Sequence, residues 1–433
     1  MTPAHSLLRF GYSLLLLLAT PLILVRLLAR GFRQRGYWHH IGERWGVYDQ
    51  APQQATVWIH AVSMGEMRAA QPLISRLRSD YPRHPVVVSC MTATGREVAR
   101  DLYGDSVVCV YLPYDFFRLQ RRVIAHFKPS VLLIMETEIW PNLLAACRAD
   151  RVPALLVNGR LSEKSRRGYA RFAPVSALTR DALQSLHGVA AQSSADAKRL
   201  ESLGARSPVV TGNIKFDVPV DSSLVSQGRR WRDALRADKQ VLLAASTRDG
   251  EETLLLDAYR KAFSAEERNH LLLVIVPRHP QRFDAVYQLI RAAGFRAGRR
   301  QDTQATPDHA EIWLGDSMGE MAAYIAMCDV AFIGGSLLPL GGQNLIEACA
   351  QGRPVIMGPS TFNFTAAARL AMEAGAMRQA ADANAVMLAA KEWLANREMR
   401  DSASRAAMAF AGAHAGATER TMGLIAPLLN ARN

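Results

Sequence analysis

The sequence has few cysteines, and none of them stands in a paired motif. Its five cysteines are an odd number, they lie in apolar surroundings at positions 90, 109, 147, 328 and 349, and no C-x-x-C occurs. This usage indicates core thiols in a reducing compartment and argues against a disulfide framework.

Two common nucleotide-binding signatures and a metal signature are also missing. Neither G-x-G-x-x-G nor G-x-x-x-x-G-K-[ST] occurs, which counts against dehydrogenases and P-loop enzymes. No histidines and cysteines stand at ligand spacing, and Asp316 lacks the Asp-x-Asp pattern that holds a divalent ion under a nucleotide diphosphate. We therefore expect neither a metal nor a cofactor.

Acidic residues are in short supply. The chain has 52 Lys and Arg against 39 Asp and Glu, giving a formal net charge of +13 over 433 residues. Such an excess indicates an anionic partner, which charge alone leaves open among nucleic acid, anionic lipid and a phosphorylated substrate. The hydrophobic content of 49% is that of a globular protein, and the length suggests two or three domains.

Long apolar runs are absent except at the amino terminus. Residues 10–25 carry no charge and are bounded by Arg9 and Arg26. As a helix they would cover about 24 Å, somewhat short of a hydrocarbon core of about 30 Å. The stretch that follows, RLLARGFRQRG, has no small-x-small cleavage site, so residues 1–30 are predicted to be a retained membrane anchor. Length leaves open whether the helix spans the bilayer or lies in one leaflet.

Arginines are distributed unequally around this run. Only Arg9 precedes it, whereas five follow it: Arg26, Arg30, Arg33, Arg35 and Arg44. The positive-inside rule then places the body of the protein in the cytoplasm.

A first α/β domain is predicted for residues 31–215. Strand-length apolar runs alternate with helical patterns at 57–62, 86–89, 107–112, 131–135 and 154–157. This alternation indicates a doubly wound parallel sheet, in which ligands meet the carboxyl ends of the strands. The polar residues at those ends include Glu66, Glu136, Glu138, Asn158 and Arg160.

Glu66 is the candidate general base of this domain. Gly65 permits a tight turn, so Glu66 enters the first turn of a helix, where the dipole favours the carboxylate. A helix-start acid placed only for the dipole is the competing interpretation. Glu136 and Glu138 form a second acid pair before Trp140 and Pro141, and they could instead cap a helix there.

A basic stretch follows Arg160. Lys164, Arg166, Arg167 and Arg171 are interleaved with Tyr169 and Phe172. The residues leave two interpretations open, a solvated helix face or a surface that holds phosphates or anionic headgroups.

A second α/β domain is predicted for residues 216–433, with its last helix able to pack back on the first. Asn213 and Lys215 precede the boundary and are expected to face the cleft between the domains, where they would bind the donor, Lys215 being suited to an anionic one. Apolar strands recur at 242–245, 271–276, 312–314, 330–333 and 355–357. Ser246 and the Arg278-His279 pair follow two of them, and a guanidinium at a strand end is a good phosphate fork. His279 between two prolines is equally an ordinary turn residue.

Residues 334–364 concentrate glycine and proline around one short helix. Gly341 and Gly342 stand just before Gln343 and Asn344, where a helix is expected to begin with its N–H groups open to an anion. Glu347 lies one turn further, where a carboxylate can accept two hydrogen bonds from a ribose. An ordinary glycine-rich loop is the alternative.

These motifs together resemble a known family. Gly-Gly-x-Asn-x-x-Glu, Gly-x-Pro-Val and Gly-Pro-x-Thr-Phe-Asn-Phe of residues 341–364 are similar to the donor site of the 3-deoxy-D-manno-octulosonic acid (Kdo) transferases of lipid A assembly. Ser-x-Gly-Glu at 63–66, Asn-Gly-Arg at 158–160 and Pro-Arg-His-Pro at 277–280 resemble further motifs of that family. The chain departs from the pattern at Gln343 and Ser360, where histidine is expected.

The resemblance implies a fold, a reaction and a location. It implies a GT-B glycosyltransferase, with two Rossmann-like domains facing a cleft, that moves Kdo from CMP-Kdo to lipid IVA with inversion. It assigns the catalytic carboxylate to Glu66, the acceptor side to Glu136, and the donor to the second domain, with Arg278 ahead of His279 as a direct contact. The enzyme would sit on the cytoplasmic face of the bacterial inner membrane, against anionic lipids, and would bind no nucleic acid.

Two alternatives stay open from the residues. The first is another GT-B envelope glycosyltransferase or a nucleotide-sugar epimerase that uses a UDP-sugar. The second is a basic membrane-surface or nucleic-acid-binding protein without catalysis, although acids at strand ends count against it.

Overall fold

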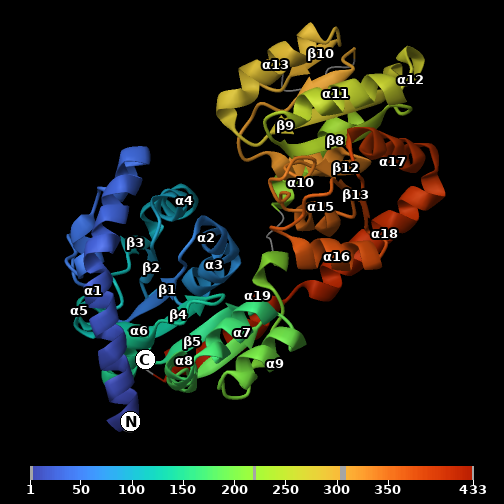
Figure 1. Cartoon of the computed structure of the whole chain (residues 1–433). Helices are drawn as coiled ribbons and strands as arrows, with labels where there is room; N and C mark the ends of the chain where they lie inside the picture. Colours follow the sequence, from blue (N-terminus) through green and yellow to red (C-terminus); the bar gives the residue numbers. More distant parts are fainter. Residues whose placement is uncertain (1–2, 218–220, 303–308, 432–433) are drawn as a thin grey trace. The chain divides into compact units, whose positions relative to one another are not determined.

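The computed structural model describes residues 3–217, 221–302 and 309–431, which form two compact units (Figure 1). The first comprises residues 1–217 and 415–433, and the second residues 218–414. The change of unit at residue 217 lies two residues beyond the predicted boundary. The last helix, α19 (Ala417–Asn430), belongs to the first unit.

A seven-stranded parallel sheet forms the centre of the first unit. Its strand order is β3-β2-β1-β4-β5-β6-β7. The bounds are β1 Thr56–His60, β2 Val86–Cys90, β3 Val108–Tyr111, β4 Pro129–Met135, β5 Ala154–Gly159, β6 Gly188–Ala191 and β7 Val209–Val210. Ile59 and Trp58 face opposite sides of β1, and each belongs to a different core. The sheet is therefore buried on both faces, as its continuous apolar strands require.

Helices cover both faces of this sheet. They are α2 Met64–Ala69, α3 Gln71–Asp80, α4 Ala93–Tyr103, α5 Phe117–Phe127, α6 Pro141–Ala149, α7 Glu163–Arg171, α8 Ala173–Gln184 and α9 Ser194–Ser202. Met422, Ile425 and Leu429 of α19 are buried in the same core as Ile59. The carboxyl-terminal helix is thus an integral part of the first unit.

The second unit repeats this architecture. Its parallel sheet has the order β10-β11-β9-β8-β12-β13-β14. The strands are β8 Gln240–Thr247, β9 Leu271–Pro277, β10 Ala297–Arg299, β11 Ile312–Leu314, β12 Val330–Ile333, β13 Val355–Met357 and β14 Met377–Gln379. The helices are α10 Ser222–Asp233, α11 Glu251–Ala262, α12 Ala265–Asn269, α13 Phe283–Ala292, α14 Met321–Met327, α15 Ile346–Ala350, α16 Thr365–Glu373, α17 Ala383–Ala395 and α18 Arg397–His414. The prediction of two doubly wound parallel-sheet domains is confirmed.

The amino-terminal helix α1 (Pro3–Arg33) lies on the first unit and leaves its apolar side exposed. The Tyr12 hydroxyl donates to Asp115 Oδ2 at 3.2 Å, and Asn142 Nδ2 donates to Ser13 Oγ at 3.0 Å. Leu15, Leu18 and Leu22 are each about 70% exposed. Among the described residues, the part from Ser6 to Phe32 is the one helix whose length and composition would let it cross a membrane. The helix is consistent with membrane association.

Candidate active site

Glu66 lies in the first turn of α2, just after the carboxyl end of β1. Ser63 is the N-cap, and its hydroxyl accepts from the Glu66 N–H at 3.4 Å and donates to Glu66 Oε1 at 2.8 Å. Glu66 Oε2 accepts from the Val62 N–H at 2.9 Å. Ser63 therefore caps the helix, and the two hydrogen bonds that the carboxylate accepts fix where it points.

The environment of Glu66 moves its pKa into the neutral range. Burial raises the pKa to about 7, against the hydrogen bonds from Ser63 and Val62, which favour the carboxylate. The charges of Glu138 and Glu136 raise it further. A residue that acts only through the helix dipole would keep a low pKa, whereas a general base works best with a pKa near the operating pH.

Glu136 and Glu138 follow β4 and lie close enough to Glu66 to act on its pKa. Glu136 has a left-handed backbone, with φ of 56°, which is strained for a residue other than glycine. Glu138 Oε2 accepts from Trp140 Nε1 at 2.8 Å, and burial raises the pKa of Glu138. Helix α6 begins at Pro141 with Trp140 as its N-cap, so neither Glu136 nor Glu138 caps it.

Lys215 pairs with this acid cluster. Its Nζ lies 3.3 Å from Glu136 Oε1, and its backbone N–H donates to Asn213 Oδ1 at 3.0 Å. Both residues stand in the first unit, where Asn213 opens the short 3-10 helix Ile214–Phe216. The structure thus brings Lys215 to the predicted acceptor acids.

Asn158 and Arg160 hold the loop after β5 against Glu136. Asn158 is fully buried with φ of 53°, and its Oδ1 accepts from the Ile214 N–H at 3.0 Å. The Arg160 N–H donates to the Glu136 carbonyl at 3.3 Å, while the Arg160 side chain is exposed. Asn158 Nδ2 is buried and has no hydrogen-bond partner among the described residues. Asn158 therefore fixes the strained turn beside the acids.

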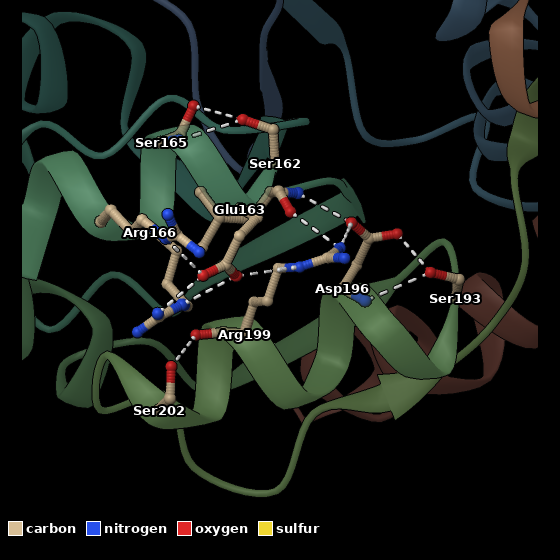
Figure 2. Close-up of polar contacts among 10 residues, drawn as sticks. Ser162, Glu163, Ser165, Arg166, Ser193, Asp196, Arg199 and Ser202 are labelled. Atoms are coloured by element: carbon tan, nitrogen blue, oxygen red, sulfur yellow. Dashed lines mark hydrogen bonds and ion pairs between the residues drawn. The ribbon is translucent and has the colours of Figure 1, made fainter.

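A polar network fastens the start of α7 to α9 (Figure 2). Asp196 Oδ1 accepts from the Leu161 N–H at 2.9 Å, and Arg199 Nη1 donates to the Leu161 carbonyl at 3.1 Å. Glu163 lies between two arginines. Its Oε1 is 2.8 Å from Arg166 Nη2 of its own helix, and its Oε2 is 3.7 Å from Arg199 Nε of α9. Two of the four basic residues expected on this face, Arg166 and Arg167, are paired with Glu163, while Lys164 and Arg171 are exposed.

A cationic cluster surrounds the loop after β9 in the second unit. The Arg278 N–H donates to the Thr247 carbonyl at 2.9 Å, which joins this loop to the end of β8. Burial and the charges of Arg248, Arg278 and Arg282 lower the pKa of His279. His279 is thereby favoured as a neutral imidazole among three guanidinium groups, an arrangement suited to an anion.

The turn that ends β8 comes very close to the glycine-rich stretch. Ser246 has φ of 55°, and a Cβ atom on Gly334 would stand 2.6 Å from the Ser246 carbonyl oxygen. A side chain at residue 334 cannot be accommodated without moving the backbone. The glycine there serves the close approach of two loops.

The helix predicted to begin at Gln343 and Asn344, with its N–H groups open to an anion, starts later than expected. The N–H groups of Gly341, Gly342 and Gln343 donate within the loop, to Ser360 Oγ, the Gly335 carbonyl and the Gly334 carbonyl respectively. Helix α15 starts at Ile346 and has only five residues, and the Ile346 N–H donates to Asn344 Oδ1 at 3.0 Å. The N–H groups of Gly341, Gly342, Gln343 and Ile346 are therefore used within the loop.

The remaining residues of this stretch support the loop. Asn344 Nδ2 donates to Glu347 Oε1 at 2.9 Å, so both ends of the Asn344 amide are engaged. Ser360, where the family pattern has histidine, accepts from Gly341 at 2.9 Å. The Gln343 side chain lies against Gly335. Both departures from the family pattern are thus accommodated within the loop.

Two buried acids that sequence reasoning did not single out stand at the start of α11. Glu251 and Glu252 are both fully buried. Glu252 Oε1 accepts from Thr247 Oγ1 at 2.8 Å and from Arg282 Nη1 at 2.7 Å. Their position after Gly250 predicts only helix-start acids, because their partners are distant in sequence.

Replacing Ser63 should shift the pH dependence of any reaction that uses Glu66 as a base. The Ser63→Ala variant loses a hydrogen bond that favours the carboxylate, so the pKa of Glu66 rises above about 7. The acid limb of the kcat/KM profile then moves to higher pH, and most of the lost rate returns by pH 9. A profile with an unshifted acid limb would contradict this assignment.

Ser193→Ala is the matched control for this measurement. Ser193 caps α9 by accepting from the Asp196 N–H, as Ser63 does for α2. Loss of either cap costs about 1 kcal/mol of stability. Only the Ser63 variant should shift the profile.

Comparisons with known proteins place the chain in a class and then in a family. Residues 39–218 match the family model described as 3-Deoxy-D-manno-octulosonic-acid transferase (kdotransferase). A UDP-GlcNAc 2-epimerase from Neisseria meningitidis, solved with UDP-GlcNAc, shares the fold with a TM-score of 0.56 over 86% of this chain and 100% of that one. At 13% identity this likeness shows the fold alone. The two parallel-sheet units thus define a GT-B architecture.

Curated relatives specify the family. The chain is 43% identical to the 3-deoxy-D-manno-octulosonic acid transferase of Bordetella pertussis over 95% of this chain and 97% of that one. The Haemophilus influenzae enzyme of the same name is 34% identical over 97% and 99%. The chain belongs to the Kdo transferase family, and it is a glycosyltransferase of lipopolysaccharide biosynthesis. The family prediction is confirmed, and the non-catalytic alternative is excluded.

Proposed function

We propose that the enzyme transfers Kdo from CMP-Kdo to the 6' hydroxyl of lipid IVA with inversion at the anomeric carbon. The observation that carries the mechanism is the position of the half-buried Glu66 carboxylate, which Val62 and Ser63 hold at the start of α2. Burial and the charges of Glu138 and Glu136 raise the pKa of Glu66 to about 7. At this pKa, Glu66 is ionised in a large fraction of the molecules at neutral pH. The carboxylate is nevertheless basic enough to accept a proton. Glu66 then deprotonates the acceptor hydroxyl as that oxygen attacks the anomeric carbon.

The acceptor acids have distinct supporting roles in this proposal. Lys215 compensates the charge of Glu136, which limits the repulsion that Glu136 exerts on Glu66. Glu138 is held by Trp140 and raises the pKa of Glu66. Asn158 and Arg160 fix the backbone of this corner, so that an incoming hydroxyl meets a preformed site.

The donor is held by side chains of the second unit. Arg278 and His279 follow β9 within the cationic cluster, and the CMP phosphate leaves as an anion whose charge these groups stabilise. Glu347 is the candidate for the ribose diol. Ser246, Gly341, Gly342, Gln343 and Asn344 shape the backbone around the donor, and Asn213 acts from the first unit by holding Lys215.

Product analysis tests this function. Purified protein is incubated with lipid IVA and either CMP-Kdo or a set of UDP-sugars, and the products are identified by mass spectrometry. We expect one or more Kdo additions with CMP-Kdo and no product with UDP-sugars. A product formed only from a UDP-sugar would overturn the donor assignment, and lipid IVA that stays unmodified in the presence of CMP-Kdo would overturn the acceptor assignment.

We further propose that α1 binds the cytoplasmic face of the inner membrane and lies in the plane of one leaflet. Tyr12 and Ser13, near the start of the apolar stretch, are bonded to Asp115 and Asn142 of the globular unit. A bilayer-spanning helix would have to break these bonds and leave Asp115, which is buried, without Tyr12. The exposed leucines are then inserted among acyl chains, and the arginines after residue 25 meet anionic headgroups.

Polar replacements on the exposed side of α1 should release the protein from membranes. Each leucine buried in lipid contributes about 1.5–3 kcal/mol, so Leu15→Ser, Leu18→Ser and Leu22→Ser together should weaken vesicle binding by at least about 100-fold. The thermal midpoint should not change, because these side chains are about 70% exposed. Leu27→Ser is the control: Leu27 is 7% exposed, so its loss should lower the midpoint and leave most vesicle binding intact. Undiminished binding of the triple variant would contradict the proposal.

A further inference from the structure

The Glu251 carboxylate gathers backbone N–H groups from two loops of the second unit. Its Oε2 accepts from the Arg248 N–H at 2.8 Å and from the Gly335 N–H at 2.6 Å. Its Oε1 accepts from the Leu337 N–H at 2.9 Å. The side chain is 0% exposed, so these three donors replace the water that a carboxylate would otherwise bind.

The two loops follow neighbouring strands at the centre of the sheet. Arg248 is in the turn between β8 and α11, and residues 334–337 directly follow β12, which pairs with β8 in parallel. Gly335 is 84 residues away from Glu251 in sequence. The left-handed backbone of Ser246 and the close approach of Gly334 to it are features of the same junction. Glu251 therefore locks a junction whose backbone is otherwise strained.

Glu252 extends this arrangement to a third loop. Its Oε1 binds Arg282 Nη1, and Arg282 is in the short 3-10 helix Pro280–Arg282 that follows Arg278 and His279. Arg282 Nη2 is also 2.8 Å from Asp249 Oδ1. The first two residues of α11 thus join the loops after β8, β9 and β12, which contain the cationic cluster and the start of the glycine-rich stretch.

We propose that Glu251 is a positioning residue for donor binding: it holds the loops after β8 and β12 in the arrangement that receives the cytidine monophosphate part of the donor. This inference rests on the proposed location of the donor in the second unit. Glu251 itself touches only backbone N–H groups, so it acts through the loops. The same physical chemistry predicts that glutamine cannot replace it, because an amide has one oxygen to offer three donors and turns its own N–H₂ toward the others.

The test compares donor affinity with folding. CMP is titrated calorimetrically into the full-length parent protein, Glu251→Gln and Asp257→Asn, at a temperature at which circular dichroism shows all three to be folded. Asp257→Asn removes one negative charge from an exposed position of the same helix. We expect Glu251→Gln to weaken CMP binding by about tenfold or more and to raise the KM for CMP-Kdo by a similar factor, with a smaller change in kcat. The Asp257→Asn variant should match the parent.

Each outcome decides one question. If the parent itself does not bind CMP, the proposed donor site is wrong. If the parent binds CMP and Glu251→Gln binds it within twofold, the donor site stands and the positioning role is overturned. A merely structural role would lower the folded fraction and hence kcat, with KM and the CMP affinity of the folded molecules unchanged, and this result also overturns it. If Glu251→Gln does not fold, Glu251→Asp, which keeps the charge with a shorter reach, replaces it: a raised KM supports the role, and a parental KM overturns it.

Discussion

Glu66→Gln should abolish most of the Kdo transfer while leaving the fold and CMP binding intact. A general base contributes about 100- to 10,000-fold to the rate, which corresponds to about 3 to 5 kcal/mol of barrier. Glutamine preserves the local contacts, because its oxygen can accept from the Val62 N–H and its N–H₂ can donate to the Ser63 hydroxyl. It cannot accept a proton from the acceptor. The initial rate of transfer and the thermal midpoint are measured together.

The pH dependence of stability gives this variant a second signature. The pKa of Glu66 is about 7 in the folded protein against an ordinary value of 4.5, so the folded state binds the proton more tightly than the unfolded state. Stability from this group is complete below about pH 4.5 and falls as the pH rises through about 7. Glutamine does not titrate, so the Glu66→Gln variant does not lose stability in this way as the pH rises. The midpoint of Glu66→Gln should therefore improve relative to the parent between pH 5 and pH 8.

Glu136→Gln distinguishes the two acids as candidates for the base. Glu136 is paired with Lys215 and interacts with Glu66 through charge, so its replacement should change the rate less than the replacement of Glu66 does. A rate of Glu66→Gln within a few-fold of the parent would exclude Glu66 as the base. If Glu136→Gln alone shows the large loss, the base is Glu136, and the fold and donor assignments stand.

Arg278→Ala should weaken CMP binding by about 10- to 150-fold, with lipid IVA binding unaltered. A hydrogen bond to a charged group contributes about 1.5–3 kcal/mol, and the guanidinium can make two to one phosphate. Arg278 is one of the three arginines that lower the pKa of His279. It follows the end of β9 directly, where a guanidinium can bind a phosphate in a fork. Calorimetric titration of CMP measures the effect.

Arg291→Ala controls for the overall charge of the second unit. Arg291 is exposed on α13, and its removal lowers the net charge by the same amount as the removal of Arg278. A nonspecific electrostatic effect would weaken CMP binding equally in both variants and would be screened by salt. Equal affinities of Arg278→Ala and the parent would remove Arg278 from the donor site.

The strands were predictable from sequence where they are buried on both faces. The apolar runs at 131–135, 271–276 and 330–333 correspond closely to β4, β9 and β12. Strand β6 was missed because Gly188–Ala191 is short and has Val189 as its one β-branched residue among glycine and alanine. The helix expected to begin near Gln343 starts three residues later, at Ile346, whose N–H donates to the side chain of Asn344.

The site was predictable only where local sequence determines it. Glu66 and its cap are three residues apart, so their contact follows from the helix start. The ion pair of Lys215 with Glu136 joins strand ends that are distant in sequence, and it places Lys215 with the acids although it was expected at the donor. Glu251 reaches Gly335 and Leu337 across the sheet, which no local pattern could indicate. These contacts depend on strand order, which apolar runs do not specify.

The position of α19 has a consequence for how the chain folds during synthesis. The first unit is made almost entirely from the first 217 residues, yet the side of its core that contains Ile59 is closed by Met422, Ile425 and Leu429. The second unit, residues 218–414, is complete before these residues are made. The core of the first unit around Ile59 therefore stays uncovered until α19 has been synthesised. A premature stop codon near residue 415 would destabilise the first unit and leave the second unit intact.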